Sequence, residues 1–303
     1  MTEVTPPLNV SQLDERVRDA AAALGIPAAR AKTMLSTLAV SQMLPHVVAV
    51  KGGMGIKIRL GELGTRATKD LDVAAAERGA EFDRMFAELL AEGWGVVPAS
   101  KGALRKDPSA PDRVAFTGAL KPGKPHDPGV SAPRYLMQPY RVTLSFLGSA
   151  WSGLDVEVAD SEVASVEDGE ILLDDEVAAF ADRFGFGALA PVRLVELEQQ
   201  IAQKIHALSD EDYNRAHDLV DLQLLWMAKP DLAQVQHRCA ATFAWRKKQA
   251  WPPLPLRAMD GWEAQYGDAR EETLVDGDSV VIRDLAEARA WLEARISEVV
   301  AAR

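Results

Sequence analysis

The sequence contains a single cysteine and no long apolar run. Cys239 cannot form an internal disulfide and has no thiol partner for a zinc site, so we expect it to be a buried structural thiol. No uncharged apolar run approaches the roughly 18 to 20 residues that a membrane span needs. The N-terminus also lacks the positively charged start and following apolar stretch that are typical of a signal peptide. We therefore expect a cytoplasmic protein with no membrane partner.

Positive charge is also scarce, since the formal net charge is −11. This balance argues against a general nucleic-acid coat protein. The segment 101–141 is an exception, because its basic residues outnumber its acidic ones. The basic residues are Lys101, Arg105, Lys106, Arg113, Lys121, Lys124, Arg134 and Arg141, and the acidic ones are Asp107, Asp112 and Asp127. The segment is either a solvated loop or an inserted arm that contacts a polyanion.

A chain of 303 residues with 48% hydrophobic content can bury a sizeable core. Apolar spacing predicts helices at 9–24, 27–43 and 79–94, and strands near 46–50, 70–76, 94–99, 140–148 and 153–159. After about residue 192 the pattern becomes helical, at 192–209, 212–228 and 285–302. We therefore predict an α+β protein, with a mixed-sheet domain over residues 1–190 and a helical domain over residues 191–303.

Residues 50–74, VKGGMGIKIRLGELGTRATKDLDVA, have the features of a phosphate site. A strand running into Gly52 and Gly53 at the start of a helix would let backbone N–H groups approach a triphosphate, because glycine has no Cβ and a helix N-terminus favours anions. The same stretch supplies cations whose charge suits that anion. They are Lys57, Arg59, Arg66 and Lys69.

Paired carboxylates follow directly. On a strand, the period of two puts Asp70 and Asp72 on one face. Because adjacent carboxylates repel each other, a hard divalent ion such as Mg²⁺ or Mn²⁺ between them and a nucleotide's phosphates is the natural occupant. A third carboxylate would come from GLDVEV, residues 153–158, with Asp155 as first choice and Glu157 as second. Two half-exposed strands of alternating residues are the structural alternative.

The helical half offers a second group of charged residues. On the helix at 192–209, Lys204 lies near the apolar seam, so its ammonium could extend from a buried stem into a cleft. On the next helix, Asp218 and Asp221 are about one turn apart, and Arg215 lies three residues before Asp218. A surface ion pair explains this second arrangement equally well.

Two other classes of function fit parts of the sequence. His206 and the pair His217 and Asp218 could belong to an HD-like metal phosphohydrolase, although matched further ligands on helices are missing. A nucleotide-binding regulatory protein without turnover is the other alternative. It would keep the fold and lose the acids, and Asp70, Asp72 and Asp155 occurring together argue against it.

Two separated blocks resemble the AbiEii/MenT group of bacterial toxin nucleotidyltransferases, a branch of the DNA-polymerase-β-like superfamily. The first block is VKGGMGIKIRLGELGTRATKDLD, and the second is IAQKIHALSDEDYNRAHDLVDLQLL. With LDVEV between them, the resemblance touches most of residues 45–230 and is weakest over residues 100–140 and the last seventy residues. It implies a nucleotidyltransferase-like sheet domain followed by a helical domain.

The resemblance also implies roles for individual residues. Gly52 and Gly53 would contact the triphosphate of an NTP, Asp70, Asp72 and Asp155 would hold Mg²⁺, and Lys204 would reach the nucleotide. Asp218, and less directly Asp221, would match the acidic residue of the last motif beside Arg215. Thr68 occupies the place at which a partner antitoxin phosphorylates family members. The implied activity is nucleotide transfer to an RNA 3′ end, with tRNA as the expected acceptor, which would block translation and growth.

Overall fold

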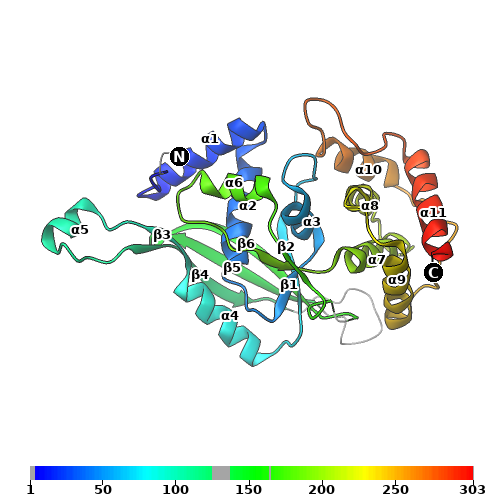
Figure 1. Ribbon diagram of the computed structural model, residues 1–303, viewed down its shortest axis with the longest axis horizontal. Helices are drawn as coiled ribbons and strands as arrows, with labels where there is room; N and C mark the ends of the chain where they lie inside the picture. The colour runs from blue at the N-terminus through cyan, green and yellow to red at the C-terminus, as the bar shows by residue number, and fades with distance from the viewer. Residues whose placement is uncertain (1–3, 125–136, 164, 303) are drawn as a thin grey trace.

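The computed structural model describes residues 4–124, 137–163 and 165–302, and within them eight strands form one mixed sheet (Figure 1). The strand order is β3-β4-β5-β6-β2-β1-β8-β7. The strands are β1 (Val48–Val50), β2 (Asp70–Ala75), β3 (Trp94–Val97), β4 (Arg113–Pro122), β5 (Gln138–Phe146), β6 (Ser149–Asp160), β7 (Glu170–Leu172) and β8 (Val192–Leu194). β2 runs parallel to β6 and β1 parallel to β8, whereas the other neighbours pair antiparallel.

Helices pack against the sheet, and a further group of helices follows it in the chain. They are α1 (Val10–Leu24), α2 (Ala28–Ser41), α3 (Gly52–Leu60), α4 (Ala80–Glu92), α5 (Lys101–Lys106), α6 (Asp175–Asp182), α7 (Leu197–Leu208), α8 (His217–Met227), α9 (Leu232–Arg246), α10 (Trp262–Glu271) and α11 (Leu285–Ala301). Local capping sets several ends: the Asn9 side chain accepts a hydrogen bond from the Gln12 N–H at the start of α1, and Gly25 ends it in the left-handed conformation. The α+β class is confirmed.

Strand alternation gives the sheet one buried and one open face over β4, β5 and β6. On β5, Tyr140, Val142, Leu144 and Phe146 are buried, whereas Arg141 and Thr143 between them are exposed. The buried face packs with α1, α2, α4 and α6 into one apolar core. The open face carries polar side chains into the region of β2, where the acidic pair lies.

A second apolar core lies among α7 to α11, and Ile56 of α3 joins it. It contains Cys239, which is buried as expected. The boundary predicted at residue 190 falls too early, because β8 belongs to the sheet through its pairing with β1 and β7. Residues 192–194 are therefore a strand rather than the start of a helix, and the helical part begins at Leu197. None of the helices described is long and apolar enough to cross a membrane.

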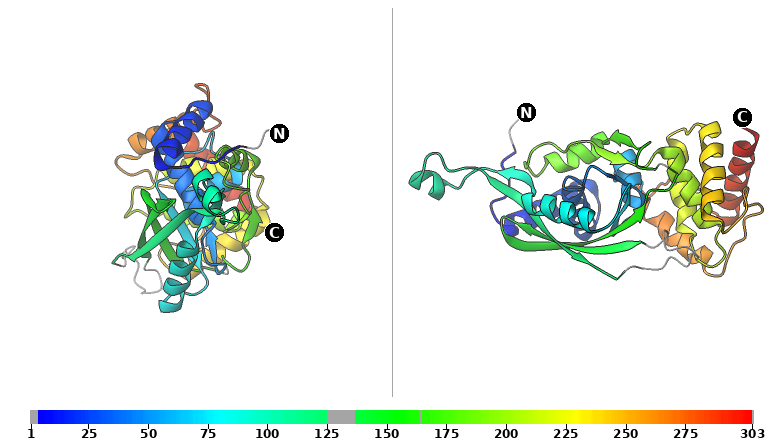
Figure 2. Two further views of the ribbon diagram at one scale, coloured as in Figure 1. Left: turned by 90° about the vertical axis from the view of Figure 1, so that its left-hand side faces the viewer. Right: turned by 90° about the horizontal axis from the view of Figure 1, so that it is seen from below.

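Within its described residues, the basic segment 101–141 is mostly regular secondary structure rather than a loop. It contains α5 and β4 and ends within β5, while Arg134 and Asp127 lie outside the described residues. Two views place α5 at one end of the molecule and α7 to α11 at the opposite end (Figure 2). The bases on α5 are therefore separated from those at the far end of β4, so the segment is not a single arm.

Candidate active site

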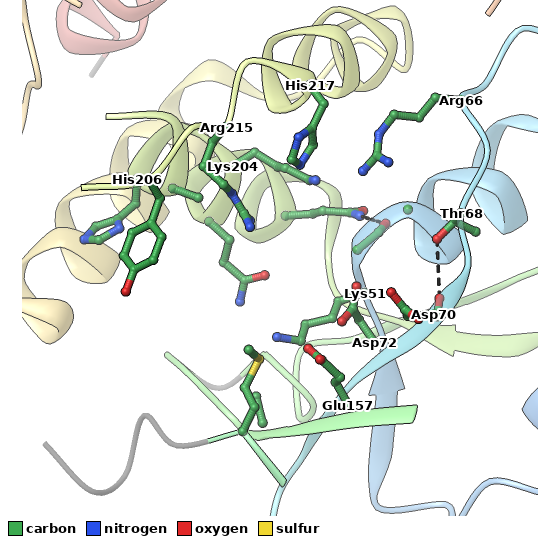
Figure 3. Close-up of a pocket in the computed structure, with 18 of the residues that line it drawn as sticks. Lys51, Arg66, Thr68, Asp70, Asp72, Glu157, Lys204, His206, Arg215 and His217 are labelled. Carbon is green, nitrogen blue, oxygen red and sulfur yellow. Dashed lines mark hydrogen bonds between the residues drawn. The ribbon is translucent and has the colours of Figure 1, made fainter. Parts of the chain in front are cut away.

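A cleft of about 740 Å³ lies between the sheet and the helical part (Figure 3). Residues 51–53, 66–70, Asp72 and Glu157 line it from the sheet side. α7, the connection 210–217 and Arg246 of α9 line it from the helical side. The cleft thus brings together residues of the two sequence blocks at 50–72 and 201–225.

Close packing fixes the start of α3 beside β2. The Lys51 N–H donates to the Asp72 carbonyl oxygen at 2.9 Å, and Gly52 has a φ of +62°. A Cβ at Gly52 would lie 2.0 Å from Asp72 Oδ2, so only glycine allows the carboxylate to approach the helix start. A Cβ at Gly53 would meet Thr68 Oγ1 at 3.0 Å. The predicted glycine start of a helix is confirmed, and it faces the carboxylate.

The acidic pair lies on one face of β2, as its spacing predicts. Asp70 is exposed and Asp72 half-buried, whereas Leu71 and Val73 face the core. Partial burial raises the pKa of Asp70 above its ordinary value, and the nearby charges of Asp72 and Asp155 raise it further. Negative charge therefore accumulates here, which favours a cation.

Both candidates for a third carboxylate lie on β6, in parallel register with the pair. Asp155 is opposite Asp70, and Glu157 is opposite Asp72. Asp155 forms an ion pair with Arg141 at 2.9 Å and is not among the residues that line the cleft. Glu157 lines it. The structure therefore favours Glu157 over Asp155, reversing the preference drawn from the sequence.

The carboxylates can be tested as a Mg²⁺ site by their number and kind. Among the described residues, no three side chains of His, Cys, Asp or Glu gather closely enough to enclose a metal. Mg²⁺ is usually held by one or two carboxylates together with water and substrate phosphates. Asp70 and Asp72 beside the open α3 N-terminus fit that pattern, whereas a structural zinc site would need a closed set of ligands.

Across the cleft, two buried aspartates on α8 hold three cations. Lys204 Nζ lies 2.6 Å from both Asp218 Oδ1 and Asp221 Oδ2. Arg66 donates to both oxygens of Asp221, at 2.8 and 3.0 Å, and Arg215 Nε donates to Asp218 Oδ2 at 2.9 Å. We call these five side chains the interdomain charge network. Three cations against two carboxylates leave it one positive charge in excess.

Burial and pairing act in opposite directions on these aspartates. Burial alone would raise the pKa of Asp218, but Lys204 and Arg215 outweigh it and hold the pKa well below its ordinary value. For Asp221, Lys204 and Arg66 likewise outweigh burial and lower the pKa. Both groups are therefore ionised at neutral pH. The surface ion pair considered as an alternative is wrong, because Asp218 and Asp221 are 0% and 1% exposed.

Two of the cations predicted to contact the triphosphate have structural partners instead. Lys57 is buried, and its ammonium donates to Glu62 Oε1 at 2.9 Å and Thr65 Oγ1 at 3.1 Å. Burial lowers its pKa to about 8. Arg59 pairs with Glu170 and donates to the Val195 carbonyl oxygen. Neither lines the cleft, because these partners hold the two side chains away from it, in different directions around α3.

Other residues line the cleft without having been predicted. Lys51 immediately precedes the paired glycines and lies beside Asp72 and Glu157 (Figure 3). Gln200 Nε2 donates to the Gly52 carbonyl oxygen at 2.8 Å, so α7 touches the glycine turn. Position next to Gly52 could have indicated Lys51, but no local pattern identifies Gln200, because its role depends on where α7 packs.

The HD-like phosphohydrolase interpretation is not supported by the position of its ligands. His217 Nε2 lies 3.4 Å from Asp218 Oδ1, but the Asp218 carboxylate is already held by Lys204 and Arg215. His206 contacts Arg246 rather than an acid. Neither histidine shares a metal-sized cluster of ligands within the part of the chain described.

A glycine-started helix facing two carboxylates on a neighbouring strand, with cations across the cleft, suits an enzyme that handles nucleoside triphosphates. This is the arrangement expected of the nucleotidyltransferase class. The chain belongs to the AbiEii family, because the family model described as "Nucleotidyl transferase AbiEii toxin, Type IV TA system" matches residues 34–294. The resemblance to toxin nucleotidyltransferases is thereby confirmed.

Two solved structures are similar to the chain over most of its length. MenT4, a nucleotidyltransferase toxin from Mycobacterium tuberculosis H37Rv, is 18% identical with a TM-score of 0.49, over 94% of this chain and 99% of that one. A protein of H. pylori described as a candidate nucleotidyltransferase is 12% identical with a TM-score of 0.40, over 88% and 91%. No curated protein matches the sequence.

The first prediction distinguishes the role of Lys51, which precedes the paired glycines, from that of Lys57 on α3. Lys51→Met should raise the KM for the NTP on the order of tenfold, because a charge-assisted contact to phosphate is lost. Lys57→Met should leave that KM unchanged and lower the free energy of unfolding by about 1–3 kcal/mol, because Glu62 loses a buried partner. Steady-state kinetics and urea unfolding measure the two effects. A rise in KM for Lys57→Met alone would contradict the placement of both residues.

The second prediction concerns acid stability. Asp218 and Asp221 have lowered folded-state pKa values, so the stability they contribute is present above the unfolded pKa of about 3.9 and is lost as pH falls below it. Asp221→Asn should cost about 3–5 kcal/mol at pH 7, because Arg66 and Lys204 lose a buried partner. The cost should shrink towards pH 2.

Urea unfolding at a series of pH values measures this dependence. The matched control is Asp19→Asn, which changes an exposed aspartate on α1. An equal loss for both variants, or a loss for Asp221→Asn that stays constant from pH 7 to pH 2, would rule out the buried ion pairs as its source.

Proposed function

We propose that this family member is a Mg²⁺- or Mn²⁺-dependent enzyme that transfers a nucleotide from an NTP to the 3′ end of an RNA, with tRNA as the acceptor. The observation that carries the proposal is the packing of the Asp72 carboxylate against Gly52. A carboxylate, which can bind a metal ion, thus lies in contact with a helix N-terminus, which can bind phosphate. A nucleotide's phosphates could therefore bind both at once.

The cations and backbone N–H groups of the cleft would bind the triphosphate, and its carboxylates would bind the metal ion. Backbone N–H groups at Gly52 and Gly53, the Lys51 ammonium and the Arg215 guanidinium would hold the triphosphate. Asp70 and Asp72 would hold the metal ion, which when bound supplies charge neutralisation at the phosphates and alignment of the attacking hydroxyl. Lys204 keeps α8 in place through Asp218 and Asp221 and adds positive charge on the helical side.

Transfer requires a proton acceptor for the attacking hydroxyl. Glu157 lines the cleft, so it would take the proton from the RNA 3′ hydroxyl, whereas Asp155 lies beside Asp70 but is paired with Arg141. The hydroxyl oxygen then bonds to the α-phosphorus, the bond from that phosphorus to the bridging oxygen breaks, and pyrophosphate leaves. The excess positive charge of the interdomain charge network suits that leaving group.

The open face of the sheet suits an RNA backbone. Lys121 of β4, Arg141 of β5, Asp155 of β6 and Asp70 of β2 are register neighbours across four adjacent strands. The Arg141 guanidinium lies over Gly153, where a Cβ would be 2.4 Å from Nη2. Cations on this face therefore lead directly to the acidic pair, which is where an acceptor's 3′ end would need to arrive.

Inhibition by a partner antitoxin fits the position of Thr68. Its hydroxyl contacts the Asp70 carbonyl oxygen at 3.4 Å and lies beside Gly53 (Figure 3). A phosphate on Thr68 would place negative charge at the start of α3 and compete with the triphosphate. The antitoxin would then relieve the block of translation and growth that the enzyme causes.

The third prediction tests the transferase directly. Purified protein, total tRNA, Mg²⁺ and each α-labelled NTP in turn should give labelled tRNA on a denaturing gel with at least one nucleotide. Asp70→Ala should lower this labelling on the order of a thousandfold, because a metal ligand is lost. Asp19→Ala, on the exposed face of α1, should label normally.

The same reactions distinguish the regulatory alternative. Binding of NTP without release of pyrophosphate would favour a nucleotide-binding regulatory protein over the transferase. Equal labelling by Asp70→Ala and the parent protein would remove the central assignment. Labelling of another RNA, but not of tRNA, would keep the chemistry and change the acceptor.

The fourth prediction separates the two groups of bases in segment 101–141. Lys121→Ala should weaken tRNA binding and reduce the slope of log K against log salt by about 1, because one phosphate contact is lost. Lys106→Ala, on α5 at the other end of the molecule, should change neither quantity. Filter binding at several salt concentrations measures both. If Lys106→Ala had the larger effect, the RNA would lie on α5 instead of the open face.

A further inference from the structure

Gln203 differs from the other polar side chains of α7. The others each hold a hydrogen-bond partner elsewhere in the molecule, and they are Glu198, Gln199, Gln200, Lys204 and His206. Gln203 is half-buried, and its side chain forms no hydrogen bond with any residue that the structure describes. Its amide has two donor hydrogens and an acceptor oxygen, which are therefore available to a ligand.

The cleft is the space that this amide can reach. Residues three or four positions apart share a face of a helix, and those of α7 that share the face of Gln203 also line the cleft. They are Gln200 and Ala207. A different face of α7, with Ile201, Ile205 and Leu208, is buried in the helical core. Because Gln203 is only half-buried and itself lines the cleft, its side chain is accessible from there.

α7 also sets the distance between Gln203 and the phosphate site. Gln200 Nε2 donates to the Gly52 carbonyl oxygen at 2.8 Å, and Gln203 is three residues further along the same helix. At 1.5 Å per residue, this places Gln203 about 4.5 Å along the helix axis from the glycine turn. The cleft continues in the same direction, since Ala207 and Asp210 line it too. A nucleotide whose triphosphate binds at the glycines can therefore extend along α7 and bring its ribose, the group next to the phosphates, to Gln203.

The chemistry of the amide suits a hydroxyl better than a phosphate. Cations and backbone N–H groups bind phosphates, and Lys51, Arg215 and the start of α3 would supply them. Next to Gln203, the Lys204 ammonium is already held by Asp218 and Asp221 at 2.6 Å. An amide and a hydroxyl can each donate and accept, so either hydrogen-bonding role of a sugar hydroxyl finds a partner in Gln203.

Resting on the proposed function, we infer that the Gln203 side-chain amide hydrogen-bonds a ribose hydroxyl of the incoming nucleotide. Gln203 is then a specificity-determining residue for the sugar. A site that hydrogen-bonds a substrate hydroxyl discriminates against the analogue that lacks it, because the protein group is then left without its partner.

Binding of nucleotide in the absence of RNA tests the inference. The probes are the four ribonucleoside α,β-methylene triphosphates, their 2′-deoxy and 3′-deoxy forms, and inorganic tripolyphosphate, each titrated calorimetrically with Mg²⁺ into the full chain. The tightest ribonucleotide should bind about tenfold more tightly than one of its two deoxy forms. Gln203→Met keeps the length of the side chain and removes its amide. It should weaken the ribonucleotide about tenfold and leave that deoxy form and tripolyphosphate unchanged.

Two further variants make the test specific. Gln200→Met removes the contact with Gly52, so it should weaken the ribonucleotide, its deoxy forms and tripolyphosphate by the same factor. Gln234→Met makes the same change as Gln203→Met on an exposed position of α9 and should have no effect. Thermal unfolding checks the fold, and Gln203→Met should unfold at the temperature of the parent protein, because no described residue loses a hydrogen bond.

The outcomes separate this inference from the proposed function. Equal affinity of the parent protein for a ribonucleotide and both deoxy forms, or a preference that persists in Gln203→Met, would overturn the ribose contact while leaving a phosphate-binding enzyme. An effect of Gln203→Met seen only when the terminal ribose of the acceptor RNA is replaced by deoxyribose would also overturn it, because the residue would then contact the acceptor. Failure of tripolyphosphate and every analogue to bind would overturn both.

Discussion

Two aspartates buried on α8 determine how the sheet and the helical part meet. A buried carboxylate is costly unless cations and hydrogen bonds neutralise it, and Asp218 and Asp221 are satisfied by Lys204, Arg215 and Arg66. Arg66 comes from the connection that leads into β2, four residues before Asp70. The ion pair with Asp221 therefore fixes the entry of β2, and with it the position of the acidic pair opposite α7 and α8.

The cleft that results has two chemically distinct ends. At one end, the start of α3, the acidic pair and the cations across from them form a place where charges of both signs are close and only partly cancelled. At the other end, Arg246 and Glu162 pair with each other, so their charges cancel.

Local patterns predicted the parts of this site that depend on one element. Gly52 and Gly53 start a helix because the preceding strand is apolar and the glycines permit a close turn, and Asp70 and Asp72 share a face because a strand repeats every two residues. The same reasoning was wrong for Lys57 and Arg59, since periodicity does not say which side of a short helix packs inward. It also ranked Asp155 above Glu157, because the register of β6 against β2 and the pairing with Arg141 are long-range facts.

The sequence by itself determined the α+β class, the glycine turn, the acidic strand and the family, because each of these is carried by short local patterns, and the family by the order of such patterns along the chain. Only the tertiary structure decided that Lys57 is buried against Glu62, that the described part of segment 101–141 is divided between α5 and the sheet, and that Asp218 and Asp221 are buried against Lys204. These depend on contacts between residues far apart in the chain, such as Arg246 with His206 and Arg66 with Asp221, which are 40 and 155 positions apart. Side-chain partners across such separations are chosen by packing, and no local periodicity encodes them.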